Sequence, residues 1–233
     1  GPGLGPKRRM EIQNVGNAVA QFDADIVGLQ EVRKLNRSEA AFVQHGPEQP
    51  QADYLAPDGY HVVYRTNAVT RHGEHGNAML SRWPVLAQQH EDMSDHRFEQ
   101  RGLLHAEVAV DGHPVHVVVV HLGLIRASRV RQLVQLAQFI AREIPSHAPV
   151  LVAGDFNDWG ALLSRSLAGV GLRSSSVRQM PTFPARLPLV QFDHMYVRGL
   201  TPLVQHVPRG RNWWRMSDHL PLIAEFELAP RKD

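Results

Sequence analysis

Cysteine is absent from the 233-residue sequence, and this absence excludes several kinds of site at once. Without thiols the chain has no disulfides, no thiolate zinc site and no cysteine nucleophile. Any metal ion must therefore be held by oxygen or imidazole ligands. The sequence offers such ligands in 23 Asp and Glu residues and 14 His residues.

Long apolar runs and a strong charge bias are also missing. No stretch approaches the roughly 18 apolar residues of a membrane-spanning helix, and 25 Lys and Arg nearly balance 23 Asp and Glu. No composition break, repeat or low-complexity segment divides the chain, so we expect one domain over residues 1–233. The opening residues 1–9 have no apolar signal core. We therefore expect a cytoplasmic protein, while a leader lost before Gly1 stays open.

The N-terminal part follows a helix-then-strand pattern. Apolar residues recur at helical spacing over 12–22, and a short apolar run at 24–29 ends at Gln30 and Glu31. The sequence thus predicts a strand that closes at Glu31. Other short apolar runs predict strands, and stretches rich in Pro and polar residues predict loops. The strands are expected at 61–65, 77–81, 192–197 and 222–228, and the loops at 36–59 and 172–188.

The middle of the chain gives the clearest local signals. Two apolar strands, 103–110 and 115–120, flank Asp111-Gly112, a dipeptide that favours the tight hairpin turn. Residues 128–143 place apolar side chains on one face and Arg and Gln on the other, and Pro145 follows, so we expect a helix here. A strand at 150–153 comes next and leads to Asp155. The order of helix, strand and acidic residue is the same as in the segment that ends at Glu31.

Acidic and imidazole residues follow several of these predicted strands. The segment Val152-Ala153-Gly154-Asp155-Phe156-Asn157-Asp158-Trp159 delivers a carboxylate and an amide, two residues apart, into what reads as a turn. A hard divalent cation and a bound phosphate need such groups. Glu31 closes an earlier strand, and Ser217-Asp218-His219 stands near the C-terminus. Together these positions indicate one composite site.

Each of these residues taken alone has a plainer interpretation. Asp155 could form an ordinary turn and Asp218 could cap a turn or helix, while Glu31 could be a solvated charge and His121 a packing or surface residue. Asp193 is harder to dismiss because it lies in an otherwise apolar strand. A buried carboxylate without a partner costs several kcal/mol, and His219 would supply that partner.

The joint order of the motifs resembles the endonuclease/exonuclease/phosphatase superfamily, which has the deoxyribonuclease I-like fold. Six motifs carry the resemblance over nearly the whole chain. They are Leu29-Gln30-Glu31, Gly76-Asn77-Ala78-Met79-Leu80-Ser81, Val120-His121-Leu122, Gly154-Asp155-Phe156-Asn157, Phe192-Asp193-His194 and Ser217-Asp218-His219-Leu220-Pro221. The resemblance implies a four-layer α/β/β/α sandwich of two mixed sheets, and a small bacterial member of the family. Members usually begin with a further strand, so we expect that first strand to be missing here.

The resemblance also implies metal-dependent phosphoester hydrolysis. Glu31 would be the main ligand of Mg²⁺, with Mn²⁺ as an alternative, and Asp218 would bind metal or orient His219. Asp155 and Asn157 would position or deprotonate the attacking water and hold the phosphate. His219, fixed by Asp193, would act as base or as cationic donor. His121 would stabilise the developing charge or protonate the leaving oxygen.

The substrate class is less specified than the chemistry. Arg209-Gly210-Arg211-Asn212-Trp213-Trp214-Arg215 could stack bases and bind backbone phosphate, or could meet a phospholipid headgroup at a peripheral membrane contact. We expect nucleic acid as the substrate, with a phospholipid or small phosphate ester and a non-catalytic binding module as the alternatives. We expect a monomer. The predicted substrate contacts are Asn77, Arg101, Arg211, Trp213 and Trp214.

Overall fold

A computed structural model describes residues 24–35, 59–70, 73–158, 160–176, 178–214 and 218–228 of the chain. The side chains of 29–35, 64–70, 73–75, Asn212 and Trp214 fall outside this description. The helix predicted over 12–22 and nearly all of the loop predicted over 36–59 also lie outside the described residues.

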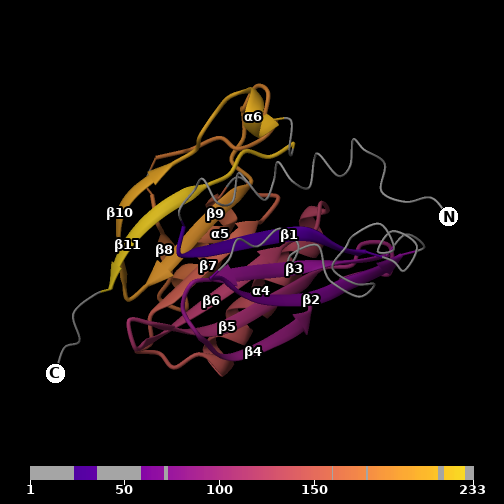
Figure 1. Ribbon diagram of the computed structural model, residues 1–233. Coiled ribbons are helices and arrows are strands. Elements are labelled where there is room, and N and C mark those ends of the chain that lie inside the picture. The colour runs from indigo at the N-terminus through magenta and orange to yellow at the C-terminus, as the bar shows by residue number, and fades with distance from the viewer. Residues whose placement is uncertain are drawn as a thin grey trace.

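The described strands form three sheets (Figure 1). The largest has the order β4-β5-β6-β7-β9-β8 and contains β4 (Val85–Asp92), β5 (Gly102–Val110), β6 (His113–His121), β7 (Val150–Asp155), β9 (Asp193–Arg198) and β8 (Arg173–Ser174). A second sheet has the order β1-β3-β2, with β1 (Ile26–Leu35), β3 (Gly73–Ser81) and β2 (His61–Thr70). The third pairs β10 (Leu200–His206) with β11 (Ile223–Leu228). The described helices are α4 (Arg126–Glu143), α5 (Ala161–Ala168) and the single turn α6 (Arg211–Trp214).

Strand β6 explains how the layers stack. Its run of valines is buried on both faces of the sheet, as expected for a central strand. Val117 and Val119 belong to a core cluster with Met79 of the three-stranded sheet, whereas Val118 and Val120 pack in a cluster with residues of α4 and α5. Alternate side chains of a strand point to opposite faces. The six-stranded sheet therefore lies between the three-stranded sheet on one face and helices α4 and α5 on the other, an arrangement visible in Figure 1.

The predicted hairpin and the predicted helix are both present. Asp111 and Gly112 have φ angles of 48° and 81°, which match the tight turn whose twist suits paired strands. The helix begins slightly earlier than expected, at Arg126, and buries Leu133, Leu136 and Ile140 along one side. None of the described helices is long and apolar enough to pass through a membrane.

Several strand boundaries differ from the sequence prediction: β2 runs to Thr70 instead of residue 65, and β3 begins at Gly73 instead of residue 77. Two further differences concern predicted site residues. The strand expected to close at Glu31 continues to Leu35, because β1 pairs with β3 along its whole length and only shifts register between Leu29 and Val32. An extra residue at such a shift bends a strand without ending it. Asp155, expected in a turn, is the last residue of β7 and pairs with both neighbouring strands.

Several loops meet at one end of the strands of the six-stranded sheet, where predicted site residues lie. We call this end of the sheet the site edge. Strands β6 and β7 end there in parallel register, while β9 begins there because it is antiparallel to β7. By the same pairing, β4 ends and β5 begins there. The connections at this edge are residues 93–101, 122–125, 156–160 and 175–192.

Candidate active site

Three predicted site residues lie side by side at the site edge. His121 at the end of β6 is paired in register with Asp155 at the end of β7, and Asp155 is paired with Asp193 at the start of β9. Three sequence-distant residues therefore form one row across adjacent strands. The spacing between strands of a sheet, about 5 Å, brings such side chains within reach of one another.

Asp155 occupies the centre of the row and is buried. Its Oδ1 accepts a hydrogen bond of 2.9 Å from the backbone N–H of Asn157. Its Oδ2 lies 3.6 Å from Nε2 of His121 and 3.6 Å from Nε2 of His219. Asp155 is thus fixed on one side by the backbone and faces two imidazoles on the other.

Asn157 is held by a backbone conformation that few side chains adopt. Its φ is 48°, in the left-handed region that Asn tolerates better than most residues. In this conformation its side-chain N–H₂ donates a 2.7 Å hydrogen bond to the carbonyl of Leu122. The bond ties the loop after β7 to the loop after β6.

His219 reaches the row from a different part of the chain and is held by Asp193. Nδ1 of His219 lies 2.7 Å from Oδ2 of Asp193, and the same oxygen accepts a 2.6 Å hydrogen bond from the hydroxyl of Thr182. The ring centroids of Phe183 and Phe192 lie 5.0 and 6.3 Å from that of His219. The imidazole is therefore fixed by one carboxylate and bordered by two aromatic rings.

The two imidazoles that face Asp155 have opposite electrostatic environments. Burial, with the charges of Arg101 and His219, lowers the pKa of His121 to about 3, so its ring is neutral. Burial alone would also lower the pKa of His219, but the hydrogen bond and charge of Asp193, with the charges of Asp155 and Asp218, raise that pKa to about 9. One carboxylate thus faces a neutral and a positively charged imidazole.

Gly154 permits β6 and β7 to approach closely at the row. Its φ is 151°, and a Cβ built there would lie 1.9 Å from the carbonyl oxygen of Val120. No side chain fits at that distance. Position 154 therefore requires glycine because of its contact with β6. The neighbouring residues in the sequence do not reveal this requirement.

The described substrate-contact candidates differ in their surroundings. Asn77 is fully buried, and its N–H₂ donates a hydrogen bond of 2.8 Å to the carbonyl of Gly102. Its Oδ1 has no hydrogen-bond partner among the described atoms. Arg101 donates 3.2 Å to the carbonyl of Leu122 and lies close enough to His121 to lower its pKa. Arg211 is exposed and Trp213 is half-buried. Trp214 lies in α6, with its side chain outside the description.

The metal ligands predicted from the sequence are Glu31 and Asp218. The backbone of Glu31 lies at the register shift of β1, opposite the part of β3 that contains Asn77, whose side chain reaches the site edge at Gly102. Asp218 is exposed, and its charge acts on His219. Carboxylate and amide oxygens at this edge fit a hard divalent cation. Asp155, Asp193 and His219 also have ligand atoms within 4.8 Å of one another, but Asp193 and Nδ1 of His219 are engaged in their mutual hydrogen bond.

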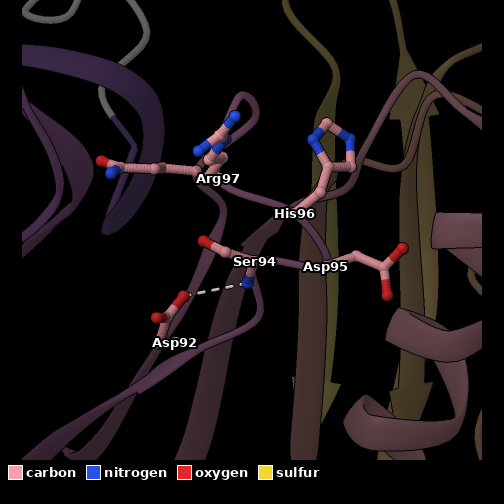
Figure 2. Close-up of a pocket in the computed structure, with 6 residues that line it drawn as sticks. Asp92, Ser94, Asp95, His96 and Arg97 are labelled. Atoms are coloured by element: carbon pink, nitrogen blue, oxygen red, sulfur yellow. Dashed lines mark hydrogen bonds between the residues drawn. The ribbon is translucent and has the colours of Figure 1, made fainter.

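Sequence reasoning missed the part of the site contributed by the loop over 175–192. Thr182 and Phe183 lie in a stretch that reads as a featureless loop, where no periodicity marks a functional residue. A pocket of about 340 Å³ in the connection after β4 was also not foreseen. Figure 2 shows that Asp95 points from this pocket toward a helix, and the Asp95 carboxylate accepts hydrogen bonds from Ser128 and Arg131 of α4. None of the predicted site residues lines the pocket.

Comparison with known proteins identifies the family of the chain. A profile of the Endonuclease/Exonuclease/phosphatase family matches residues 5–219. The chain is 37% identical over 229 residues to the protein YbhP of Escherichia coli (strain K12), with 95% of this chain and 90% of YbhP covered.

Two solved structures are also similar. One is the mannosyl-6-phosphatase Bt3783 of Bacteroides thetaiotaomicron VPI-5482, with a TM-score of 0.71, 16% identity and coverage of 94% of this chain and 91% of that one. The other is TDP2 of D. rerio in complex with a single strand DNA product, with a TM-score of 0.67, 20% identity and coverage of 93% and 91%. By the profile match and the YbhP relationship, the chain belongs to the Endonuclease/Exonuclease/phosphatase family of phosphoester hydrolases and has its deoxyribonuclease I-like α/β fold.

Proposed function

We propose that this protein hydrolyses phosphoester bonds at the site edge with the help of a divalent cation, Mg²⁺ first among the candidates. The observation that carries the proposal is the arrangement of Asp193, His219 and Asp155. A carboxylate 2.7 Å from one imidazole nitrogen holds the ring, and the other nitrogen faces a second carboxylate at 3.6 Å. A positioned imidazole and carboxylate of this kind serve general acid–base catalysis.

The roles of the residues follow from their hydrogen bonds. Asp193 accepts the proton on Nδ1 of His219, which makes Nε2 the atom that exchanges protons or donates to the substrate. Asp155 would hold the attacking water and take up its proton, while the positively charged His219 would donate a hydrogen bond from Nε2 to a phosphate oxygen. Asn157 would keep Asp155 in place through its backbone N–H. The neutral ring of His121 would donate a hydrogen bond to the phosphate or to the leaving oxygen.

Glu31 and Asp218, the ligands predicted from the sequence, would hold the proposed cation beside the site edge. When bound, it would neutralise charge on the phosphoryl group and polarise its oxygens. The oxygen-rich donor set at this edge suits Mg²⁺ or Mn²⁺ rather than a soft metal.

The decisive experiment is hydrolysis of bis(p-nitrophenyl) phosphate and p-nitrophenyl phosphate by purified protein after treatment with EDTA, with and without added Mg²⁺ or Mn²⁺. We expect turnover only with the metal. The variant His219→Ala, purified identically, controls for contaminating phosphatases. Metal-independent turnover, or equal turnover by this variant, would contradict the proposal.

Nucleic acid remains the substrate predicted from the sequence. Support comes from Arg211 and Trp213 near the site in sequence and from the DNA product bound to the structurally similar TDP2. The test is cleavage of plasmid, single-stranded DNA and abasic-site duplex with Mg²⁺. A phosphate monoester is a second candidate because Bt3783 is a mannosyl-6-phosphatase, and release of phosphate from sugar phosphates tests it. No turnover of any ester, with folded protein and metal present, would favour the non-catalytic binding module.

A further inference from the structure

The most exposed large hydrophobic side chains of the described chain gather on the loops of the site edge. Phe98 is 83% exposed, Leu189 70%, and Leu124 and Leu187 67% each. Ile125, next to Leu124, is also exposed. Leu86 of β4 and Leu203 of β10, at 56% each, are less exposed than the first four of these residues, similar to Ile125 at 53%, and lie outside these loops. Folding alone gives no reason to place apolar side chains around a catalytic edge.

These apolar residues form two flanks, one on each side of the catalytic row. On the first flank, Phe98 lies in the turn between His96 and Glu99, and Glu99 accepts a 3.2 Å hydrogen bond from the backbone N–H of Leu124. This bond joins the Phe98 turn to Leu124 and Ile125. Leu122, two residues before Leu124, directly follows His121, so this flank borders the His121 end of the row.

The second flank borders His219. Residues 183–190 form a short hairpin in which Phe183 pairs with Val190, and Leu187 and Leu189 lie in its tip. The hairpin is attached to the site because the backbone N–H of Ala185 donates a hydrogen bond of 2.8 Å to the carbonyl of Asp218. The catalytic row thus lies between two exposed apolar loops.

Cations accompany the apolar side chains on both flanks. Arg97 lies with its guanidinium carbon 4.6 Å from the ring centroid of Phe98, and Figure 2 shows Arg97 directed away from Asp95. Arg126 and Arg186 are exposed beside Ile125 and Leu187. On the first flank the neighbouring acids are paired, since Asp95 is bound to Arg131 and Glu99 lies 3.6 Å from Arg101. The flanks therefore combine apolar side chains with positive charge.

This combination favours one class of partner. Four of the five apolar side chains are aliphatic, and aliphatic groups offer no ring on which a nucleic-acid base can stack. Leu, Ile and Phe interspersed with Arg are typical of surfaces that enter the headgroup region of an anionic membrane, where arginines meet lipid phosphates. We propose that the rim, defined as Arg97, Phe98, Leu124, Ile125, Leu187 and Leu189, docks on an anionic phospholipid surface and presents a phospholipid headgroup ester to the catalytic row. The substrate part of this inference rests on the proposed function.

The test is co-sedimentation of the full chain with vesicles of phosphatidylcholine that contain phosphatidylglycerol, compared with phosphatidylcholine alone. We expect binding to the anionic vesicles, weakened at least ~10-fold by Leu187→Ser with Leu189→Ser or, independently, by Phe98→Ser. The matched controls Leu86→Ser and Leu203→Ser remove exposed leucines outside the rim and should bind like the parent protein. Two variants on separate loops keep the test valid if one fails to fold.

Parallel measurements separate this inference from the proposed function. Turnover of bis(p-nitrophenyl) phosphate without binding to anionic vesicles would overturn the rim proposal and leave the hydrolase proposal standing. Vesicle binding without turnover of any ester would support docking and overturn the hydrolase proposal together with the headgroup substrate. If the rim variants instead lose binding to single-stranded DNA, or lose a dimer seen by sedimentation velocity, then the rim serves nucleic acid or a second copy of the chain, and the lipid proposal is wrong.

Discussion

Nδ1 of His219 lies 2.7 Å from Oδ2 of Asp193, although the two residues are 26 positions apart and approach from different elements. Asp193 begins a strand of the six-stranded sheet, whereas His219 lies between α6 and β11. The pair joins the C-terminal segment to the row His121, Asp155 and Asp193. Its integrity is the first property to test.

We expect His219→Ala and Asp193→Asn each to lower the turnover of bis(p-nitrophenyl) phosphate by at least ~10²-fold, because each removes or misorients a positioned acid–base group. Steady-state kinetics at saturating Mg²⁺ measures the change, and thermal melting confirms the fold. The exposed His113 on β6 provides the control His113→Ala, which should keep full turnover. Near-parental activity in either site variant would mean that the pair is not part of the catalytic machinery.

Thr182→Val should have a smaller effect on the same reaction. The substitution removes the 2.6 Å hydrogen bond to Asp193 while keeping the side-chain volume. A hydrogen bond to a charged group contributes about 1.5 kcal/mol or more, which corresponds to about a tenfold loss of turnover. The comparison of kcat between Thr182→Val and Thr182→Ser measures it, since Ser retains the hydroxyl. A loss as large as that of His219→Ala would show that Thr182 does more than strengthen the hold of Asp193 on His219.

Gly154→Ala should destabilise the fold strongly. A methyl group at this position would lie 1.9 Å from the carbonyl oxygen of Val120, so β6 and β7 would have to separate at the site edge. Gly169→Ala is the matched control, because its nearest neighbour would be 3.7 Å away and its φ is −62°. Chemical denaturation should show a large loss for the first variant and little change for the second. If both variants were equally stable, the predicted clash between a side chain at position 154 and the carbonyl of Val120 would be wrong.

A buried histidine pair under α4 should make stability depend on pH. Nε2 of His105 lies 2.9 Å from Nδ1 of His116, with the rings stacked. Burial, with the charge of His116, lowers the pKa of His105 from 6.5 to about 4, and burial likewise lowers the pKa of His116. The unfolded chain therefore binds protons below pH 6.5 that the folded chain excludes. The stabilisation is complete above pH 6.5 and is lost as the pH falls toward 4.

Urea denaturation at about pH 7.5 and about pH 5 measures this dependence. The double variant His105→Leu with His116→Val should lose less stability between the two conditions than the parent protein. His113→Gln, which changes an exposed histidine of the same hairpin, should leave the difference unchanged. An identical pH dependence in all three proteins would show that the pair does not titrate on unfolding.

The sequence predicts those elements whose signals are local. Asp111-Gly112 specifies its hairpin through turn chemistry, and the apolar face of α4 is complete within one helix. It does not predict β4, whose pattern of exposed residues lacks regular alternation, or the eight-residue α5, which offers only two buried leucines. The predicted end of β1 at Glu31 is wrong because pairing with β3 extends the strand to Leu35. The sequence of one strand does not show how far its partner will pair with it.

The same distinction applies to the site. His121, Asp155 and Asp193 can be proposed from strand ends, because strands of one sheet share an edge. Their register, and the position of His219 against Asp193, depend on how distant segments meet. Thr182 and Gly154 act through single contacts with Asp193 and Val120, and such contacts leave no periodic pattern in a sequence.

The place of His219 in the chain separates the candidate site from the core of the fold. All six strands of the largest sheet lie within residues 85–198, and the two core clusters that flank it draw on no described residue later than Tyr196. His219, which is hydrogen-bonded to Asp193, belongs to none of these strands or clusters. Local opening of the segment around His219 would therefore break this hydrogen bond and leave the sheet and both clusters in place. Under the proposed function, heating should then remove activity before the sheet unfolds.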